Sequence, residues 1–288
     1  MKIKVIDTTL RDGNHALNEQ LTPGQVKNIC SQLDNAGLYA VEVGLGTGLG
    51  GSIPHNCTNT IDLLKAARGV LKKTKLATLF VPGIGDLNDL RQGADVGLDL
   101  VRIAVLCTKV DSAIPFIQAA KKMNLQTCVF LMASHILLPN ELATQAKIVQ
   151  DAGSDFIYIG DSIGAMTSKD ISDRVCAVSK AVTIPLGIHT HNSLGLAVSN
   201  AVEGVNAGCN YIDGTLEGLG EGGGNGNLQA IVAVCEKLGI HTGVDFNLLN
   251  HIAEKSLRPL MLKPQELRSN EIAEGFSGEL PQILKNLE

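Results

Sequence analysis

The sequence predicts an α/β fold, a closed (β/α)8 barrel of the TIM type with a short C-terminal extension. Eight short runs rich in β-branched residues alternate with longer segments whose apolar residues recur at helical spacing. Glycine follows several of these segments where a helix would end, as at Gly37, Gly153 and Gly208. The length of 288 residues suits one barrel of roughly 250 residues. An open, doubly wound sheet is the alternative that the same alternation allows.

The eight predicted strands are assigned in chain order from their composition. They cover residues 2–9, 40–44, 75–81, 100–105, 127–133, 156–161, 185–192 and 211–218. Between them, helical spacing is clear at Val26, Ile29 and Leu33. Strands separated by helices pair in parallel through right-handed crossovers, and eight such units close into a barrel. We therefore assign residues 1–240 to the catalytic barrel and residues 241–288 to a short helical tail.

The composition excludes several classes of protein. With 24 Lys and Arg against 29 Asp and Glu, the chain has no basic surplus to neutralise the phosphates of a nucleic acid. The longest apolar runs, such as residues 129–133, are far shorter than the ~20 residues of a membrane span, and the N-terminus does not resemble a signal peptide. The seven cysteines form no CxxC pair, which argues against a disulfide framework or a zinc ribbon. We expect a cytoplasmic protein that binds neither nucleic acid nor membrane.

Polar residues follow the predicted strands, at the place where barrels of this kind carry out their chemistry. In chain order they are Arg11, Asp12, His15, Glu42, Ser134, His135, Asp161, Ser162, His189, His191, Asn192 and Glu217. Because the carboxyl ends of all eight strands meet at one rim of the barrel, we expect these side chains to surround a common site.

The two histidines of the HTH motif are the sharpest signal. Residues two apart on a strand point to the same face, so His189 and His191 project together. Two neutral imidazoles and a carboxylate make a metal site with open positions for substrate, and Asp12, at a neighbouring strand end, can supply the carboxylate. The alternative is a pair of hydrogen-bonded core histidines, but the position at a strand end favours the metal site.

Two glycine-rich stretches raise the question of nucleotide binding. Residues 46–51, GTGLGG, match the dinucleotide pattern GxGxxG, but residues 66–75 carry no acid at the expected distance. We therefore exclude a Rossmann site. Residues 218–224, GLGEGGG, precede a helical segment and fit either an anion site at a helix N-terminus or a plain flexible loop.

Longer motifs resemble a known family. DTTLRDG at residues 7–13, HTHN at residues 189–192 and the glycine-rich loop with Asn225 resemble the DRE-TIM metallolyase superfamily, which contains isopropylmalate synthase, homocitrate synthase and hydroxymethylglutaryl-CoA lyase. Seven segments, in order across residues 1 to about 262, are similar to the 4-hydroxy-2-oxovalerate aldolases of that superfamily. They include FLMASH at residues 130–135 and HNSLGLAVSNA at residues 191–201.

This resemblance implies a divalent cation, Mn²⁺ or Mg²⁺, bound by Asp12, His189 and His191, with Asn225 as a further ligand. It implies retro-aldol cleavage of a 4-hydroxy-2-oxo acid, such as 4-hydroxy-2-oxovalerate, to pyruvate and an aldehyde. In that chemistry the cation stabilises the oxyanion of the pyruvate enolate.

The resemblance also implies roles for four more residues. Arg11 resembles the arginine that supports the enolate oxygen and binds substrate, and His15 resembles the histidine that removes the proton of the C4 hydroxyl. Ser162 is expected to touch the substrate carboxylate. Glu42 is expected to bind substrate, or to orient from the barrel interior the groups that do so.

The tail departs from the aldolase pattern. In that family it is longer, carries a tyrosine that assists catalysis and docks an acetaldehyde dehydrogenase. Here Phe276 lies near the expected tyrosine, and all three tyrosines, Tyr39, Tyr158 and Tyr211, come earlier. We therefore expect a monomer or homo-oligomer without a tightly bound dehydrogenase.

Three functions remain open at this point. The first is the metal-dependent aldolase, a carbon–carbon lyase acting on a small 2-oxo acid. The second is a Claisen-type synthase or acyl-CoA lyase with the same metal site, and the third is a noncatalytic barrel. A Schiff-base aldolase is disfavoured because no lysine lies in the carboxyl-terminal half of any predicted strand.

Overall fold

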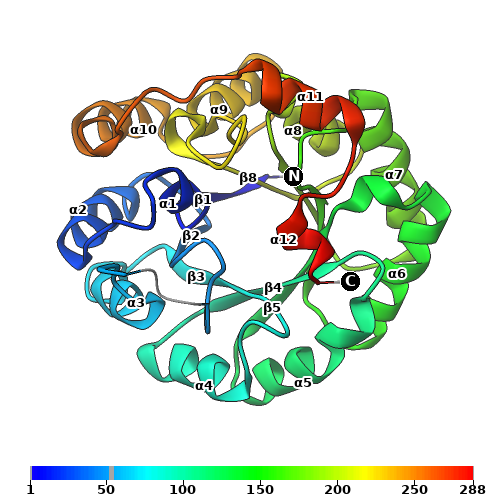
Figure 1. The fold of residues 1–288 in the computed structure, drawn as a ribbon, viewed down its shortest axis with the longest axis horizontal. Coiled ribbons are helices and arrows are strands. Elements are labelled where there is room, and N and C mark those ends of the chain that lie inside the picture. Colours follow the sequence, from blue (N-terminus) through cyan, green and yellow to red (C-terminus); the bar gives the residue numbers. More distant parts are fainter. Residues whose placement is uncertain (1, 52–54, 288) are drawn as a thin grey trace.

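The computed structural model describes residues 2–51 and 55–287. Within these residues eight parallel strands close into a barrel (Figure 1). They are β1 (Lys4–Leu10), β2 (Ala40–Val43), β3 (Lys75–Phe80), β4 (Leu100–Leu106), β5 (Gln126–Met132), β6 (Phe156–Asp161), β7 (Leu186–Thr190) and β8 (Tyr211–Gly214). The predicted barrel is confirmed. The open-sheet alternative is wrong, because β1 pairs with both β2 and β8 and so leaves no sheet edge.

Helices follow the strands and, apart from the short α1 at the carboxyl end of β1, form the outer layer of the barrel (Figure 1). They are α1 (Asp12–Ala16), α2 (Pro23–Leu33), α3 (Thr60–Arg68), α4 (Leu87–Val96), α5 (Ile114–Lys122), α6 (Pro139–Asp151), α7 (Ser168–Ala181), α8 (Ala197–Asn206) and α9 (Leu228–Lys237). Gly153 follows α6 with a φ of +102°, a backbone conformation that favours glycine and ends the helix. Among the described residues, no helix has both the length and the apolar character that crossing a bilayer requires.

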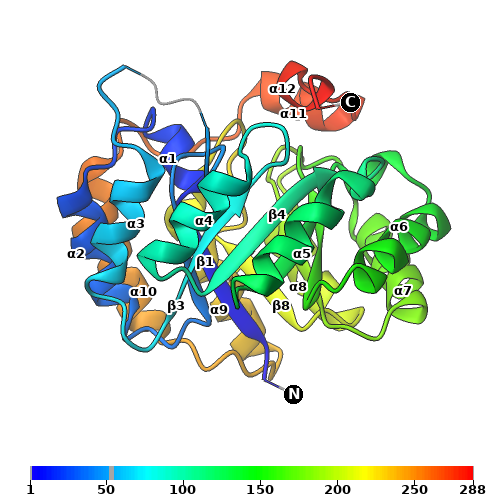
Figure 2. The same cartoon turned by 90° about the horizontal axis from the view of Figure 1, so that it is seen from below.

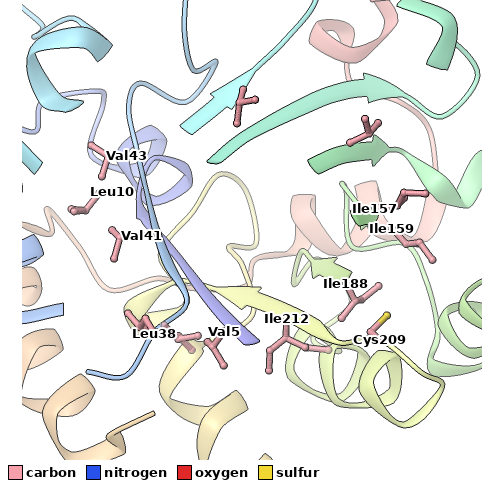
Figure 3. Close-up of a cluster of buried hydrophobic side chains, with 14 of the residues drawn as sticks. Val5, Leu10, Leu38, Val41, Val43, Ile157, Ile159, Ile188, Cys209 and Ile212 are labelled. Carbon is pink, nitrogen blue, oxygen red and sulfur yellow. The ribbon is translucent and has the colours of Figure 1, made fainter. Parts of the chain in front are cut away.

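The strands are buried on both faces. Outward-facing residues such as Val5, Ile188 and Ile212 pack with the helices in one large apolar cluster (Figure 3). Inward-facing residues form a second cluster, in which the rings of Phe156 and Tyr211 stack with centroids 4.3 Å apart. Because side chains fill the interior of the barrel, the polar rim at the carboxyl ends of the strands is where a site can open.

Two strands end at least two residues earlier than predicted. β7 ends at Thr190, so His191 lies just beyond it and forms an isolated bridge with Asn225. β8 ends at Gly214 because the chain turns into a short 3-10 helix, η3 (Leu216–Gly218). These early ends let the glycine-rich loop approach β7, where the N–H of residue 226 donates to the carbonyl of Thr190 at 3.0 Å.

After α9 the chain forms α10 (Phe246–Ile252), a π-helical turn, α11 (Ser269–Ser277) and α12 (Gln282–Lys285). α11 and α12 lie over the carboxyl ends of the strands (Figure 2). Gln265 ties this segment to the barrel, since its Oε1 accepts from Gly220 N at 3.2 Å and its Nε2 donates to Gly222 O at 2.8 Å. The boundary at residue 240 between barrel and tail stays a prediction.

Candidate active site

Three side chains at the rim form a group able to hold a metal ion. Asp12 begins α1 directly after β1, His189 lies in β7, and His191 follows β7. One ligand atom of each lies within 4.8 Å of the others, and His189 Nε2 is 3.6 Å from Asp12 Oδ2. The structure thus brings together the three residues that the sequence predicted as ligands.

The electrostatics keep this group in the form that binds a cation. Burial would raise the pKa of Asp12, but Arg11 and the neighbouring histidines hold it well below its usual range. Burial lowers the pKa of His191 to about 4, an effect larger than the opposing charge of Asp12. The carboxylate is therefore charged and the His191 imidazole neutral near pH 7, as metal ligands must be.

A second carboxylate orients His189. Asp213, in β8, has its Oδ1 2.8 Å from Nδ1 of His189. This contact assigns the ring proton to Nδ1 and leaves the lone pair of Nε2 on the side of Asp12, the arrangement usual for a metal-bound histidine. Burial would raise the pKa of Asp213, but His189 and Arg102 hold it below its ordinary value.

Asn225 supplies a further polar atom beside this group. The residue is 3% exposed, and its Oδ1 has no hydrogen-bond partner among the described residues. An unpaired buried amide oxygen is costly unless a ligand or an ion completes it. A backbone β-bridge holds Asn225 next to His191. The donor set then comprises a carboxylate, two imidazoles and an amide oxygen, which suits a hard divalent cation such as Mg²⁺ or Mn²⁺. The residues present therefore fit a metal.

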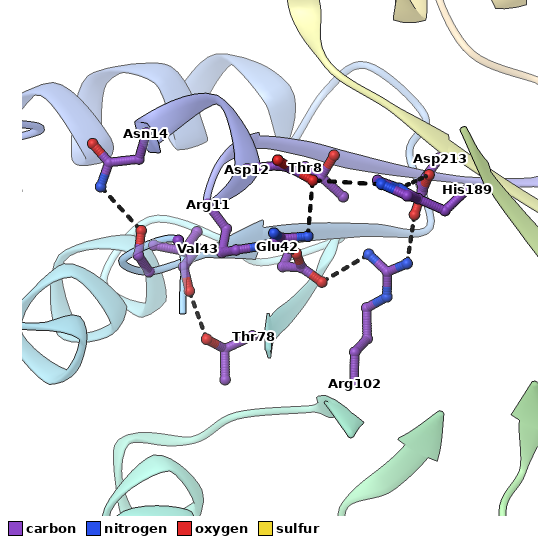
Figure 4. A network of polar contacts seen from close by, with 12 residues as sticks. Thr8, Arg11, Asp12, Asn14, Glu42, Val43, Thr78, Arg102, His189 and Asp213 are labelled. Carbon is purple, nitrogen blue, oxygen red and sulfur yellow. Dashed lines mark hydrogen bonds and ion pairs between the residues drawn. The ribbon is translucent and has the colours of Figure 1, made fainter. Parts of the chain in front are cut away.

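A closed ring of charged side chains links the metal group, Asp12, His189 and His191, to the barrel interior (Figure 4). Arg11 Nη2 lies 3.2 Å from Asp12 Oδ2, and Arg11 also pairs with Glu42. Arg102 Nη1 in turn lies 2.8 Å from Glu42 Oε2, and its Nη2 pairs with Asp213, the carboxylate that orients the metal-group histidine. Each charge in the ring therefore faces at least one opposite charge.

Sequence reasoning missed two residues of this ring, Arg102 and Asp213. Arg102 carried the clearer signal. It lies within β4 and is fully buried, with its guanidinium 4.4 Å from the ring centroid of Tyr158. A single charge inside the apolar run LVRIAVL was the available signal, because charged side chains are almost never fully buried without partners.

A cavity of about 140 Å³ opens over the metal group. Its polar lining includes Arg11, Asp12, His15, Ser162, His189 and His191. Its apolar lining includes Leu79, Val81, Phe130, Met132, Leu284 and Leu287. The cavity thus offers one small molecule a charged end beside the metal group and an apolar end beneath α12.

Several sequence candidates lie outside this cavity lining. Glu42 is fully buried behind Arg11, so it holds that guanidinium and reaches the cavity only through it. His135 contacts the tail, with Nε2 3.0 Å from Gly278 O. Asp161 accepts two backbone N–H groups of the loop after β6, and burial raises its pKa to about 7.

Both glycine-rich stretches reach the cavity, which Gly46, Thr47 and Glu221 line. Gly46 lines it and lies against the imidazole of His15. The loop at residues 218–224 leads to α9, whose N-terminus is capped by the chain itself, since Asn227 Oδ1 accepts from Ala230 N at 3.0 Å. That capping favours the plain-loop interpretation of residues 218–224 over an anion site.

The fold and this donor set define the class of protein. A family model described as HMGL-like matches residues 2–255, and the chain belongs to this family. Two solved structures share the fold: the carboxyl transferase domain of Rhizobium etli pyruvate carboxylase (TM-score 0.81, 19% identity, 93% of this chain and 50% of that one), and an N-terminal domain from Bacteroides vulgatus (TM-score 0.83, 24% identity, 99% and 95%).

Within the family, the chain is similar to curated proteins named 4-hydroxy-2-oxovalerate aldolase. The protein of Carboxydothermus hydrogenoformans is 43% identical over 96% of this chain and 83% of its own length. That of Moorella thermoacetica is 42% identical over 98% and 84%, and that of Thermus thermophilus is 39% identical over 95% and 80%. The resemblance predicted from the sequence motifs is confirmed.

Proposed function

We propose that this chain is a divalent-metal-dependent aldolase that cleaves a 4-hydroxy-2-oxo acid, such as 4-hydroxy-2-oxovalerate, to pyruvate and an aldehyde. It is a carbon–carbon lyase of the HMGL-like family, as its relatives' shared name and near full-length similarity indicate. The observation that carries the proposal is that Asp12, His189 and His191 converge on the cavity that Arg11 and His15 also line. The noncatalytic alternative is wrong, and the name that the relatives share favours the aldolase over the acyl-CoA alternatives.

Asp12, His189, His191 and Asn225 would hold the cation. When bound there, a divalent cation supplies Lewis-acid stabilisation of the negative charge that develops on the C2 oxygen during cleavage. Arg11 adds to that stabilisation, because its guanidinium lines the same cavity and is aimed by its pairs with Asp12 and Glu42. Ser162 lines the cavity as well and is proposed to bind the substrate carboxylate.

His15 is proposed as the base. Its imidazole takes the proton of the C4 hydroxyl while the oxygen's electrons form the aldehyde C=O bond. The C3–C4 bond breaks and its electron pair becomes the enolate of pyruvate. A proton from solvent then adds at C3, and His15 returns the proton that it took to solvent. Such a step needs a neutral imidazole close to the C4 hydroxyl, and His15 lines the cavity together with the metal group.

Metal removal tests the proposal. Purified protein treated exhaustively with EDTA should lose pyruvate release from 4-hydroxy-2-oxovalerate, and added Mn²⁺ or Mg²⁺ should restore it, as metal analysis and a coupled pyruvate assay can show. His189→Ala and His191→Ala should lose both metal and rate, whereas Arg11→Ala should lose rate and keep the metal. Full turnover after EDTA, or a substrate adduct trapped by borohydride, would exclude the metal mechanism.

The partners and the metal identity are narrower proposals. A small 2-oxo acid is the substrate, Mn²⁺ or Mg²⁺ is the cation, and the chain works as a monomer or homo-oligomer in the cytoplasm without a tightly bound dehydrogenase. Support for the last point comes from the tail, which differs from the aldolase pattern around Phe276. Purification from the native source, followed by mass determination of the intact assembly, tests it.

A further inference from the structure

The imidazole of His15, the proposed base, contacts the carboxylate of Glu19, a residue that the sequence motifs did not indicate. His15 Nδ1 lies 3.0 Å from Glu19 Oε1, and both side chains are largely enclosed, with 26% and 14% of their surface exposed. The same carboxylate accepts the backbone N–H of Gly46, which is 3.0 Å from Oε1 and 3.1 Å from Oε2. Glu19 therefore bridges the imidazole to the loop that follows β2.

An unusual backbone turn aims Glu19 at His15. α1 ends at Ala16, so helical geometry does not bring the two side chains together. Instead, Asn18 and Glu19 both adopt left-handed conformations, with φ of +54° and +61°, which residues other than glycine rarely adopt. The turn is closed by the N–H of Glu19, which donates to Asn14 O at 2.9 Å. Strained residues of this kind tend to cluster at functional sites.

The other side of the imidazole rests on bare glycine backbone. A Cβ atom built on Gly46 would lie 1.8 Å from His15 Nε2 and 2.0 Å from Cε1, so the ring occupies the space that any other residue would need. Contact with Glu19 at Nδ1 and with Gly46 beside the Nε2 end of the ring leaves the ring little freedom to rotate. Gly46 and His15 both line the cavity.

We propose that Glu19 is a positioning residue for His15, whose carboxylate accepts the Nδ1 proton and so keeps Nε2 unprotonated at the cavity wall. This inference rests on the proposed function, in which the imidazole takes the proton of the C4 hydroxyl. The arrangement follows the general logic in which a third group orients the catalytic base and selects its tautomer. Glu19 does not touch substrate and acts only through His15.

The charges around the ring agree with this role. Burial would lower the pKa of His15, but the hydrogen bond to Glu19 and the charge of Asp12 raise it above its ordinary value, and Glu221 adds to the effect from the loop after β8. Once the ring has taken the substrate proton, the imidazolium faces the Glu19 carboxylate at hydrogen-bond distance. The carboxylate therefore stabilises the protonated ring as well as the reactive tautomer.

The first test is kinetic. Glu19→Ala should lower kcat for pyruvate release by about 10- to 100-fold, as is typical when an orienting partner is lost, with bound metal and KM little changed. Glu19→Gln keeps an acceptor for Nδ1 and should lose less. Gly46→Ala should also lower kcat, because its Cβ displaces the ring. Glu236→Gln, at an exposed position of α9, is the control and should match wild type.

The second test separates positioning from a structural role. In wild type, kcat/KM should fall as the pH drops through the pKa of His15, because the base must be neutral. Loss of the Glu19 charge lowers that pKa, so the acid limb should move to lower pH by about one unit in Glu19→Gln. A long-range ¹H–¹⁵N spectrum of the histidine rings, with His15 assigned from His15→Ala, should show the proton on Nδ1 in wild type.

These outcomes separate the inference from the function on which it rests. If wild type releases no pyruvate, the proposed function fails, and the ring spectrum still reports the tautomer. If wild type is active and His15→Ala is slow, but Glu19→Ala stays within about threefold of wild type with an unmoved acid limb, the inference alone is wrong. An Nε2–H tautomer in wild type would also overturn it.

Discussion

At the scale of single residues, the site depends on charges that are buried in pairs. Arg102 and Glu42 are fully buried and Asp213 is 1% exposed, so none of them can rely on water for solvation. A buried charge is tolerable only where an opposite charge and hydrogen bonds replace that water. The ring of charges therefore stabilises the barrel interior only while it is complete, and through Asp213 and Arg11 it also orients the metal group.

Removing Arg102 should be costly for this reason. Arg102→Met leaves the carboxylates of Glu42 and Asp213 without their shared cation, so the free energy of unfolding should fall by about 3–5 kcal/mol. Urea unfolding at pH 7 measures it. Arg91→Met, at an exposed position of α4, is the control and should lie within about 0.5 kcal/mol of wild type. Equal stability of the two variants would show that the ring contributes little.

At the scale of elements, α12 and the residues around it contact the barrel through apolar side chains. Among the described residues, the hydrogen bonds made by residues 279–287 join only partners within residues 277–287. Its remaining contacts are apolar, since Leu280, Leu284 and Leu287 pack against the inner cluster of the barrel. The segment starts at Gly278, whose φ is +67° and whose carbonyl contacts His135. α12 thus covers the cavity with apolar side chains, and the contact between His135 and Gly278 anchors the chain just before it.

Shortening the leucines of α12 should affect substrate binding more than folding. Leu284→Ala combined with Leu287→Ala removes part of the apolar lining of the cavity, so kcat/KM for 4-hydroxy-2-oxovalerate should fall about tenfold, or by roughly 1–2 kcal/mol. Metal content should not change. Lys285→Ala, an exposed neighbour on the same helix, is the matched control. A loss of metal or of fold in the double variant would mean that α12 supports the barrel itself.

At the scale of the whole molecule, the barrel is closed by the seam between β1 and β8. Asp7 accepts hydrogen bonds from Thr9 N at 3.0 Å and Thr9 Oγ1 at 2.8 Å, and Thr9 Oγ1 accepts from Leu216 N at 2.8 Å. These contacts connect the first strand to the turn after the last one. Burial raises the pKa of Asp7 to about 7, although the hydrogen bonds from Thr9 oppose the shift.

This buried acid should make stability depend on pH. Between about pH 4 and 7 folded Asp7 keeps a proton that the unfolded chain has released, so the free energy of unfolding falls as the pH rises. Asp7→Asn removes that proton, and its stability relative to wild type should therefore improve by about 2 kcal/mol from pH 5 to pH 7. Urea unfolding at both pH values measures the change. Asp95→Asn, at an exposed carboxylate, should show no such trend; a flat difference for Asp7→Asn would mean that Asp7 is charged throughout.

Much of the site could be predicted from the sequence, because its residues lie at strand ends that local composition indicates. His189 and Asp12 were found because strand ends can be located from composition, and a parallel barrel collects all strand ends at one rim. The strand prediction was less reliable at its ends. The sequence predicted β7 through Asn192 and β8 through Gly218, whereas these strands end at Thr190 and Gly214. The difference arises because the glycine-rich loop pairs with the end of β7, a contact that strand composition does not indicate.

The sequence by itself determined the alternation of strands and helices, the barrel that follows from it, and the residues at the strand ends, because these depend on periodicity and chain order. Only the tertiary structure decided which side chains meet. Arg102 reaches partners 60 and 111 residues away in the chain. Glu19 accepts a hydrogen bond from the backbone of Gly46, 27 residues away. Leu280, Leu284 and Leu287 of the C-terminal segment pack against the inner cluster of the barrel. Such contacts join residues that are far apart in the sequence and meet only when the barrel closes. Local periodicity therefore does not indicate them.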